Sequence, residues 1–375
     1  MTLVPVCSKL CSASFARATF DVNADVTSTA TGYYWHSPTN VIENATLNLN
    51  QGILAAKRLE ISGTSSVHRA GGHLALEWLD LRGTTLSIEA GDDVTHAISL
   101  YAGAALSLEK DVTLADDYPT SLQVDGSTLD LQGHRIETPS FFLAASSGAP
   151  TITRGVGGVI QGKRFSIANG ATYDYQYDAF TESGEVTSGS TMNQNTSLTL
   201  TSSLSVSGVG ASYNANAALQ VASLALLSSG SLAVNETTLI VDNLFGLQIS
   251  TDLLFAPTSA SGLNWALRLT GDSEVALQGM LGSQIVASGA PQGVEVIRDV
   301  ALYGDYTFVG YVAIPEPAAA SLLAIGGGAD GDGASAASRG VAIRVLTAAM
   351  AASRPAAASA FRGTRASSRE RVPAA

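Results

Sequence analysis

Residues 204–226, LSVSGVGASYNANAALQVASLAL, contain the pattern that decides the fold. Leu204 and Val206 flank one serine, and Leu224 and Leu226 repeat the same apolar–polar–apolar phrase 20 residues later. Alternation with a period of two, bounded by turn-forming residues, is the signal of a strand that is buried on one face. Helical spacing is nearly absent. The stretch therefore predicts short β-strands that recur at a fixed interval.

The same interval occurs at several other places in the chain. It separates Leu59/Ile61 from Leu79/Leu81, Leu86/Ile88 from Leu106/Leu108, and Leu219/Val221 from Leu239/Val241. A period near 20 that holds two or three short strands suits one coil of a parallel β-helix, because stacked coils bury their aliphatic rows together. We therefore expect an all-β fold, a right-handed parallel β-helix of about ten coils at ~4.8 Å per rung. A pair of large β-sandwiches is the alternative, although hairpin loops give less regular offsets.

One phrase carries a family resemblance. Residues 127–136, STLDLQGHRI, resemble a coil of the pectin-lyase-like right-handed β-helix proteins. The tight corner after the strand needs Gly133, because glycine adopts positive φ without steric cost. The phrase covers a single coil and carries no catalytic residue, so the resemblance implies architecture alone.

Composition excludes several classes of function. The 375 residues have a formal net charge of −12 and only 14% charged side chains, whereas a nucleic-acid binder needs a basic face. With 46% hydrophobic residues the body is not expected to be disordered. Cys7 and Cys11 are the sole cysteines, and the five histidines lack ligand spacing, so we expect neither a metal site nor a cofactor.

Shifts in composition divide the chain. Residues 1–18 are interpreted as a possible remnant of a signal peptide, because Ala16-Arg17-Ala18 has the shape of a cleavage site while the stretch before it is poorly apolar. Residues 19–180 and 196–313 are expected to form the two halves of the solenoid. Between them, residues 181–195 are rich in Ser, Thr, Gly and Asn, which predicts a loop that interrupts the coils.

The carboxyl end carries the most specific motif. Pro315-Glu316-Pro317 follows the last strand-like stretch and precedes the apolar residues 318–327. This arrangement resembles the start of a PEP-CTERM sorting signal, a bacterial tag that combines a Pro-Glu-Pro motif, a membrane-spanning run and terminal arginines. The resemblance implies export, transient membrane insertion and processing by an exosortase-type enzyme, which makes Pro315, Glu316 and Pro317 the sorting residues.

The segment after this motif departs from the family pattern. The apolar run ends near ten residues, whereas a spanning helix needs about 20. Residues 328–375 are an Ala/Arg/Ser-rich, low-complexity tail with seven arginines and no lysine, for which we expect disorder or weak helix. The abrupt change resembles translation in the wrong reading frame, so we hypothesise a frameshift near codon 327.

Few residues suggest chemistry in the body. Asp92-Asp93 and Asp116-Asp117 are the candidate carboxylates of a β-helix polysaccharide lyase or glycoside hydrolase, although a doublet in a turn is more often a solvated corner. A lyase also needs a basic residue beside the acids, and lysines are scarce. Tyr173, Tyr175 and Tyr177 alternate along one strand, so they either stack against a sugar or pack as an internal ladder.

Two functional hypotheses remain from the sequence. The first is a secreted or surface-attached bacterial protein without catalytic residues, which has a structural or adhesive role in the envelope or extracellular matrix and extracellular polysaccharide as a partner. The second is a β-helix carbohydrate-active enzyme with the same tag. They differ in whether carboxylates from successive coils converge with a basic side chain in a groove. A fragment of an autotransporter passenger is a third and weaker option.

Overall fold

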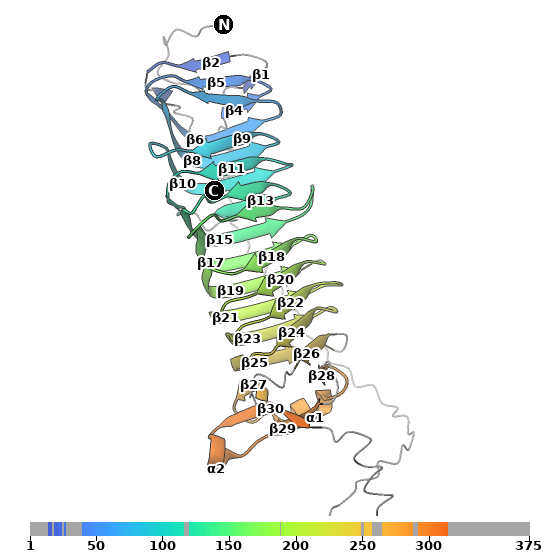
Figure 1. Ribbon diagram of the computed structural model, residues 1–375. Helices are drawn as coiled ribbons and strands as arrows, with labels where there is room; N and C mark the ends of the chain where they lie inside the picture. The colour runs from blue at the N-terminus through green and yellow to red at the C-terminus, as the bar shows by residue number, and fades with distance from the viewer. Residues whose placement is uncertain are drawn as a thin grey trace, which may run out of the picture. The chain divides into compact units, whose positions relative to one another are not determined.

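The computed structural model describes residues 14–16, 19–24, 26–27, 40–115, 120–187, 189–248, 251–256, 265–287 and 292–313. These residues form a β-solenoid of about ten turns, which confirms the all-β parallel β-helix expected from the sequence. Figure 1 shows the strands stacked rung upon rung from β2 to β28. Each complete coil consists of one long bent strand and one short strand.

The long strands build a 17-stranded sheet. Several of them hold nine or ten residues and bend midway, so that each contributes two sides of the coil. The members are β1 (Ser14–Ala16), β3 (Val26–Thr27), β4 (Asn40–Glu43), β6 (Ile53–Ser62), β8 (His73–Arg82), β10 (Asp93–Tyr101), β12 (Val112–Thr113), β13 (Leu122–Asp125), β15 (Arg135–Ala144), β17 (Val159–Ala168), β19 (Ala179–Thr187), β21 (Leu198–Ser207), β23 (Leu219–Leu227), β25 (Leu239–Leu247), β27 (Trp265–Thr270), β29 (Gln292–Ile297) and β30 (Tyr306–Ala313).

The short strands form the remaining side of the coils in three successive sheets. The first holds β2 (Thr19–Val22), β5 (Thr46–Leu49) and β7 (Ser66–Arg69). The second holds β9 (Thr85–Ile88), β11 (Ala105–Leu108), β14 (Thr128–Asp130) and β16 (Thr151–Thr153). The third holds β18 (Thr172–Tyr175), β20 (Thr191–Gln194), β22 (Ser212–Ala215), β24 (Ser231–Asn235), β26 (Asp252–Ala256) and β28 (Ile285–Ala287).

The interval of 20 residues is the register of the parallel ladders. Leu59 pairs with Leu79, and Leu86 pairs with Leu106. In the second half Leu204 pairs with Leu224, and Leu219 pairs with Leu239. The offset is longer where a corner is longer, as between Phe141 and Phe165. The predicted stacking of aliphatic rows is therefore confirmed at all four places that the sequence singled out.

The alternating residues form one continuous core. In several of the short strands the second and fourth residues are buried, as in β5, where Leu47 and Leu49 have no exposed surface. The core cluster runs without interruption from Phe20 to Val309. A single coil is open above and below, so it cannot bury its apolar side chains alone. Each apolar row is therefore buried against the rows of the coils above and below it.

Strands occupy residues 181–187 and 191–194 of the segment 181–195, so the prediction of a loop for this segment is wrong. Its first part belongs to β19, which pairs with β21, and its later part contains β20, which pairs with β18 and β22. The polar composition led to the prediction of a loop, but within β19 and β20 the Ser, Thr and Asn residues occupy outward positions. Inward, Val186, Met192 and Gln194 are fully buried and continue the core.

A glycine corner and a mixed cap complete the body. Gly133 has a φ of 90°, and a Cβ there would meet the Val156 carbonyl oxygen at 2.7 Å, which confirms the need for glycine. At the C-terminal end of the described residues, β30 runs antiparallel to both β27 and β29. The short helix α1 (Glu274–Met280) buries Leu277, and α2 (Val300–Tyr303) precedes β30. These elements cover the open edge of the last coil.

Candidate functional site

Asp92 and Asp93 have different roles, since adjacent strand residues point to opposite sides. The Asp92 side chain has no exposed surface. Its Oδ1 accepts hydrogen bonds from the Leu74 amide at 2.8 Å and Arg69 Nη1 at 2.9 Å. Its Oδ2 accepts from the Glu89 amide at 2.9 Å and pairs with Arg69 Nη2 at 2.8 Å. Asp92 is therefore an internal clasp and has no oxygen left for a substrate. Asp116 and Asp117 lie outside the described residues.

A second clasp of the same construction lies four coils further on. Asp178 Oδ1 accepts from the Ile160 amide at 2.8 Å, and Oδ2 accepts from Arg154 Nη2 and from the Tyr173 hydroxyl, each at 2.5 Å. Burial, reinforced by the Asp178 charge, raises the pKa of Tyr173 well above its usual value. Burial opposes the charge of Arg154, but the neighbouring Tyr173 and Asp178 outweigh it and raise its pKa.

The tyrosine ladder is internal in part. Tyr173 and Tyr175 occupy inward positions of β18 and are only 2% exposed. Phe141 packs against Tyr173 with ring centroids 5.3 Å apart. Tyr177 lies on the following corner and is 70% exposed. The packing interpretation thus holds for the first two rings, and only Tyr177 presents its ring outward.

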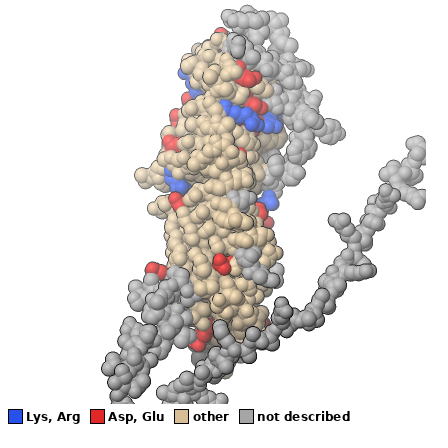
Figure 2. Space-filling model, turned by 90° about the vertical axis from the view of Figure 1, so that its right-hand side faces the viewer, with Lys and Arg blue, Asp and Glu red and all other residues tan. Residues whose placement is uncertain are grey.

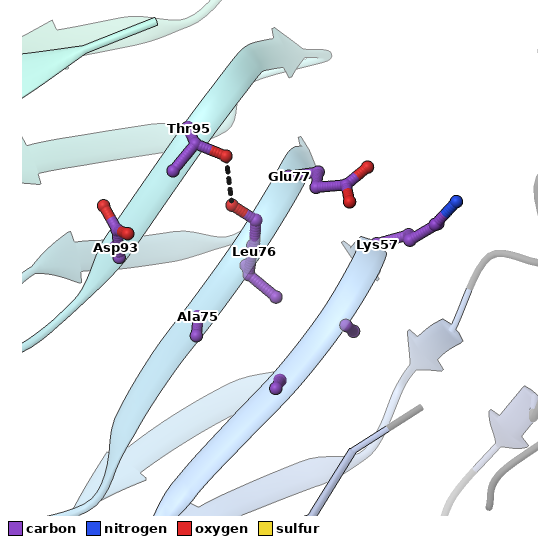
Figure 3. A pocket seen from close by; sticks show the side chains of 8 residues that line it. Lys57, Ala75, Leu76, Glu77, Asp93 and Thr95 are labelled. Carbon is purple, nitrogen blue, oxygen red and sulfur yellow. Dashed lines mark hydrogen bonds between the residues drawn. The ribbon is translucent and has the colours of Figure 1, made fainter. Parts of the chain in front are cut away.

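Asp93 belongs to a groove on the outer face of β6, β8 and β10. The groove has a volume of about 320 Å³. Its polar lining residues are Lys57 from β6, Glu77 from β8, and Asp93 and Thr95 from β10 (Figure 3). Ala55 and Ala75 form its small apolar floor. Figure 3 shows Lys57 and Glu77 extending on the same side of their strands, and Thr95 donates a hydrogen bond to the Leu76 carbonyl oxygen at 3.4 Å.

The charged groups of this groove lack protein partners. Among the described residues, Lys57, Glu77 and Asp93 make no hydrogen bond and no ion pair through their side chains. The adjoining part of the same face is different: Arg58 pairs with Asp80, and Arg82 Nε lies 3.2 Å from Glu60 Oε1. Unpaired charges from three successive strands are therefore concentrated in the groove.

Aromatic rings lie on β8 and β10 in the part of these strands that follows the groove residues. The rings of Trp78 and His96 have centroids 5.1 Å apart. The Arg82 guanidinium lies 4.4 Å from the centre of the Tyr101 ring, and the Tyr101 hydroxyl donates to Gln123 Oε1 at 3.0 Å. Burial raises the pKa of Tyr101, so this hydroxyl remains a donor at neutral pH. Trp78 is therefore the ring next to the groove residue Glu77, whereas Arg82 and Tyr101 lie at the far ends of β8 and β10.

The groove was not predicted from the sequence, although two of its charged residues follow the 20-residue period. Lys57 and Glu77 are one period apart, and the ladder places them between the paired residues Ala56/Leu76 and Arg58/Trp78. Testing charged residues for the same interval as the leucines would have found the pair. Asp93 is 16 residues beyond Glu77 because the ladder pairs it with Ala75, two residues earlier on β8, at an offset of 18 residues, so its position needed the structure.

Charge is distributed unevenly along the solenoid. No lysine or arginine occurs between Arg164 and Arg268. Figure 2 shows the basic side chains of that face over the N-terminal coils, whereas acidic side chains continue toward the opposite end. The groove thus lies in the N-terminal part of the body, before the stretch between Arg164 and Arg268 that has no cationic side chain.

Searches for other kinds of site gave three findings. No group of three or more His, Cys, Asp or Glu within reach of one metal ion occurs in the described part of the chain. No helix among those residues has the length and apolarity to cross a membrane. Pro315, Glu316 and Pro317, which the sequence predicts as sorting residues, lie outside the described residues.

Comparison with known proteins yields no relative, since no family model, no curated protein and no solved structure matches this chain. The fold and the groove are therefore the structural basis for a functional proposal.

Proposed function

We propose that this is a secreted or surface-attached bacterial β-solenoid that binds extracellular polysaccharide and has a structural or adhesive role. The observation that carries the proposal is that Lys57, Glu77 and Asp93, all unpaired, line one groove, with Trp78 next to Glu77 on β8. An ammonium group binds a sugar carboxylate, and a carboxylate accepts from a sugar hydroxyl, in both cases through charge-assisted hydrogen bonds. A nearby flat ring offers an apolar face for a sugar, as in most ligand sites that combine aromatic and polar side chains.

Export and sorting are proposed on the sequence. The last described strand, β30, ends at Ala313, and the Pro-Glu-Pro motif begins two residues later. Two prolines hold a segment extended and remove backbone donors, which suits the grip of a processing enzyme. Cleavage by an exosortase-type enzyme would release the solenoid for attachment at the cell surface.

A polysaccharide lyase or glycoside hydrolase is the second candidate. The same groove favours it in one respect, because carboxylates from successive strands lie with a lysine. Binding is favoured over catalysis because Lys57 and Asp93 are exposed. A lysine that serves as a base and a carboxylic acid that protonates a leaving group usually need desolvation.

Binding is tested with purified protein and polygalacturonate, alginate and a neutral glucan as probes in affinity electrophoresis. We expect an acidic polysaccharide to retard the protein, and the effect to weaken as salt screens Lys57. Lys57→Ala should weaken binding about tenfold, which corresponds to about 1.4 kcal/mol. Lys163→Ala, which removes an exposed lysine from β17, is the matched control and should leave binding unchanged.

The outcomes separate the candidates. Equal retardation of wild type and Lys57→Ala would contradict the groove as the binding site. Release of new reducing ends or unsaturated sugars, lost in Lys57→Ala, would establish the enzyme instead. For sorting, mass spectrometry of the protein from a host with and without the processing enzyme should show cleavage near Pro315 only in the former. An intact cytosolic pool in both hosts would overturn the export proposal.

A further inference from the structure

The short-strand side of the solenoid is interrupted between β16 and β18. Within the described residues, β16 ends the four-stranded sheet, β18 begins the six-stranded sheet, and no ladder joins them. A parallel strand exchanges hydrogen bonds with a neighbour on either side, so an interrupted ladder leaves backbone groups on the two facing edges for other partners. A hollow of about 440 Å³ lies at this interruption.

The lining of the hollow combines hydroxyl, amide and carboxylate groups with apolar side chains. Thr151 and Thr153 come from β16, and Thr172 and Asp174 come from β18. Gln176 follows on the next corner, and its amide makes no hydrogen bond among the described residues. Leu143, Ile152 and Tyr173 contribute the apolar part. Asp174 Oδ1 accepts from Asn193 Nδ2 at 2.7 Å, which leaves Oδ2 as an acceptor for a ligand.

Arg154 bridges the interruption. Its Nη2 donates to the Asp174 carbonyl oxygen and to the Tyr173 hydroxyl, each at 3.3 Å, in addition to the ion pair with Asp178. Its Nε is buried and has no hydrogen-bond partner. A buried donor without an acceptor destabilises the folded protein, so an acceptor supplied by a ligand would relieve that cost.

The charges of the hollow favour a neutral ligand. The guanidinium of Arg154 is compensated by Asp178, and Asp174 adds a carboxylate. The sequence beyond Arg164 supplies no basic residue before Arg268. An anionic sugar finds no free cation here, because Arg154 is already paired with Asp178, whereas Lys57 in the groove is unpaired. A neutral sugar offers hydroxyls that pair with threonine, glutamine and aspartate.

We propose that the hollow between β16 and β18 binds one neutral sugar residue of a polysaccharide chain. The volume falls within the usual range for ligand sites of about 300–1,000 Å³. Tyr177, 70% exposed on the corner after β18, offers a ring for the adjacent sugar of the chain. This inference rests on the proposed function, but it names a second subsite on other coils and a different charge class of saccharide.

The test uses isothermal titration of the full chain with cellohexaose, maltohexaose and a galacturonate hexamer as probes. Thr172→Trp fills the hollow with an indole ring. Thr191→Trp is the matched control, because Thr191 is the register partner of Thr172 on β20. We expect a neutral hexamer to bind wild type and Thr191→Trp alike, and Thr172→Trp to bind it at least about tenfold more weakly. Gln176→Ala, on an exposed corner, should weaken it by a smaller factor.

The results distinguish this site from the groove. Unchanged binding of every neutral hexamer to Thr172→Trp would overturn the hollow as a subsite, and so would the absence of any neutral binding. If wild type binds the galacturonate hexamer and Thr172→Trp does not, the hollow binds an anionic sugar, and the proposal of a neutral sugar is overturned. If Lys57→Ala loses acidic polysaccharide while no neutral hexamer binds the wild type, the proposed function survives and this inference fails. Circular dichroism of Thr172→Trp against Thr191→Trp verifies that both variants retain the strand signal.

Discussion

At the residue scale, the contrast between Asp92 and Asp93 yields the sharpest stability prediction. Asp92→Asn removes the charge that compensates buried Arg69 and one acceptor of a backbone amide. We expect a loss of about 3 kcal/mol in the free energy of unfolding, as for other broken buried pairs. Asp93→Asn, an exposed change, should remain within about 0.5 kcal/mol. Urea unfolding measures both, and equal losses in the two variants would contradict the clasp.

Asp92 and Asp93 also show how much of a single residue's environment can be predicted from the sequence. Alternation requires the two aspartates to face opposite sides, so one buried carboxylate was predictable. Its partner was not, because Arg69 precedes Asp92 by 23 residues and fits no 20-residue interval. The second clasp has the same construction with a separation of 24 residues, between Arg154 and Asp178. Side chains that reach diagonally across a corner leave no periodic signal.

At the element scale, β19 and β20 explain why polar segments of a solenoid are hard to predict. In β20 only Met192 and Gln194 point inward, and the side chain of Gln194 is a polar amide. Gln194 is satisfied inside the core: its Nε2 donates to the carbonyl oxygens of Thr196, Ala217 and Ala218, and its Oε1 accepts from Tyr213. A buried amide whose hydrogen bonds are satisfied by neighbouring coils can occupy a core position. Such a position is not visible as an apolar residue in the sequence pattern.

The inward tyrosines of β18 and β22 make the stability of the fold sensitive to alkaline pH. Burial raises the pKa of Tyr173 and Tyr213 well above the usual value, and burial with the Asp178 charge raises that of Tyr175 to about 12. Raised folded-state values mean that the unfolded chain releases these protons first. The stabilisation is therefore complete below about pH 10 and is lost as pH rises through the folded values.

We expect the free energy of unfolding to fall between about pH 10 and pH 12, by about 1.4 kcal/mol per pH unit for each fully buried tyrosine. Urea titrations at several pH values measure the slope, with tyrosinate absorbance as the independent readout. Tyr213→Phe should make the slope shallower, although it also loses the hydrogen bond to Gln194. Tyr177→Phe, on the exposed corner, should leave the slope unchanged. A flat profile in wild type would refute the internal ladder.

At the scale of the whole body, four apolar pairs one period apart sufficed to predict the stack. The pattern did not reveal the longer corners, the interruptions of the short-strand sheet or the antiparallel cap of β30. Those features depend on turn length and on side chains that replace backbone hydrogen bonds, as Arg154 does at the Asp174 carbonyl. Stability of such a body is approximately a sum over coils and their interfaces.

This additivity predicts that one complete coil is dispensable. Deleting residues 204–223 joins Ser203 to Leu224, and Leu224 is the register partner of Leu204. The inward positions then keep apolar residues, except Gln194, whose Oε1 loses the Tyr213 hydroxyl. In the shortened chain β24 comes to lie beside β20 in place of β22. We expect a folded protein that unfolds cooperatively, with a denaturant slope reduced by about a tenth because about one coil in ten is missing.

A deletion of half a coil is the matched control for this claim. Removing residues 204–213 joins Ser203 to Asn214, so that Asn214 and Asn216 take the buried places of Leu204 and Val206. Burying two amides without designed partners costs several kcal/mol, about 1–3 for each on mutational scales, and the strands beyond lose their register. Circular dichroism and urea unfolding of both deletions should therefore give a stable protein in the first case and a strongly destabilised one in the second. If the two deletions are equally damaging, the coil is not the unit of stability, and the aliphatic rows do not act as independent rungs.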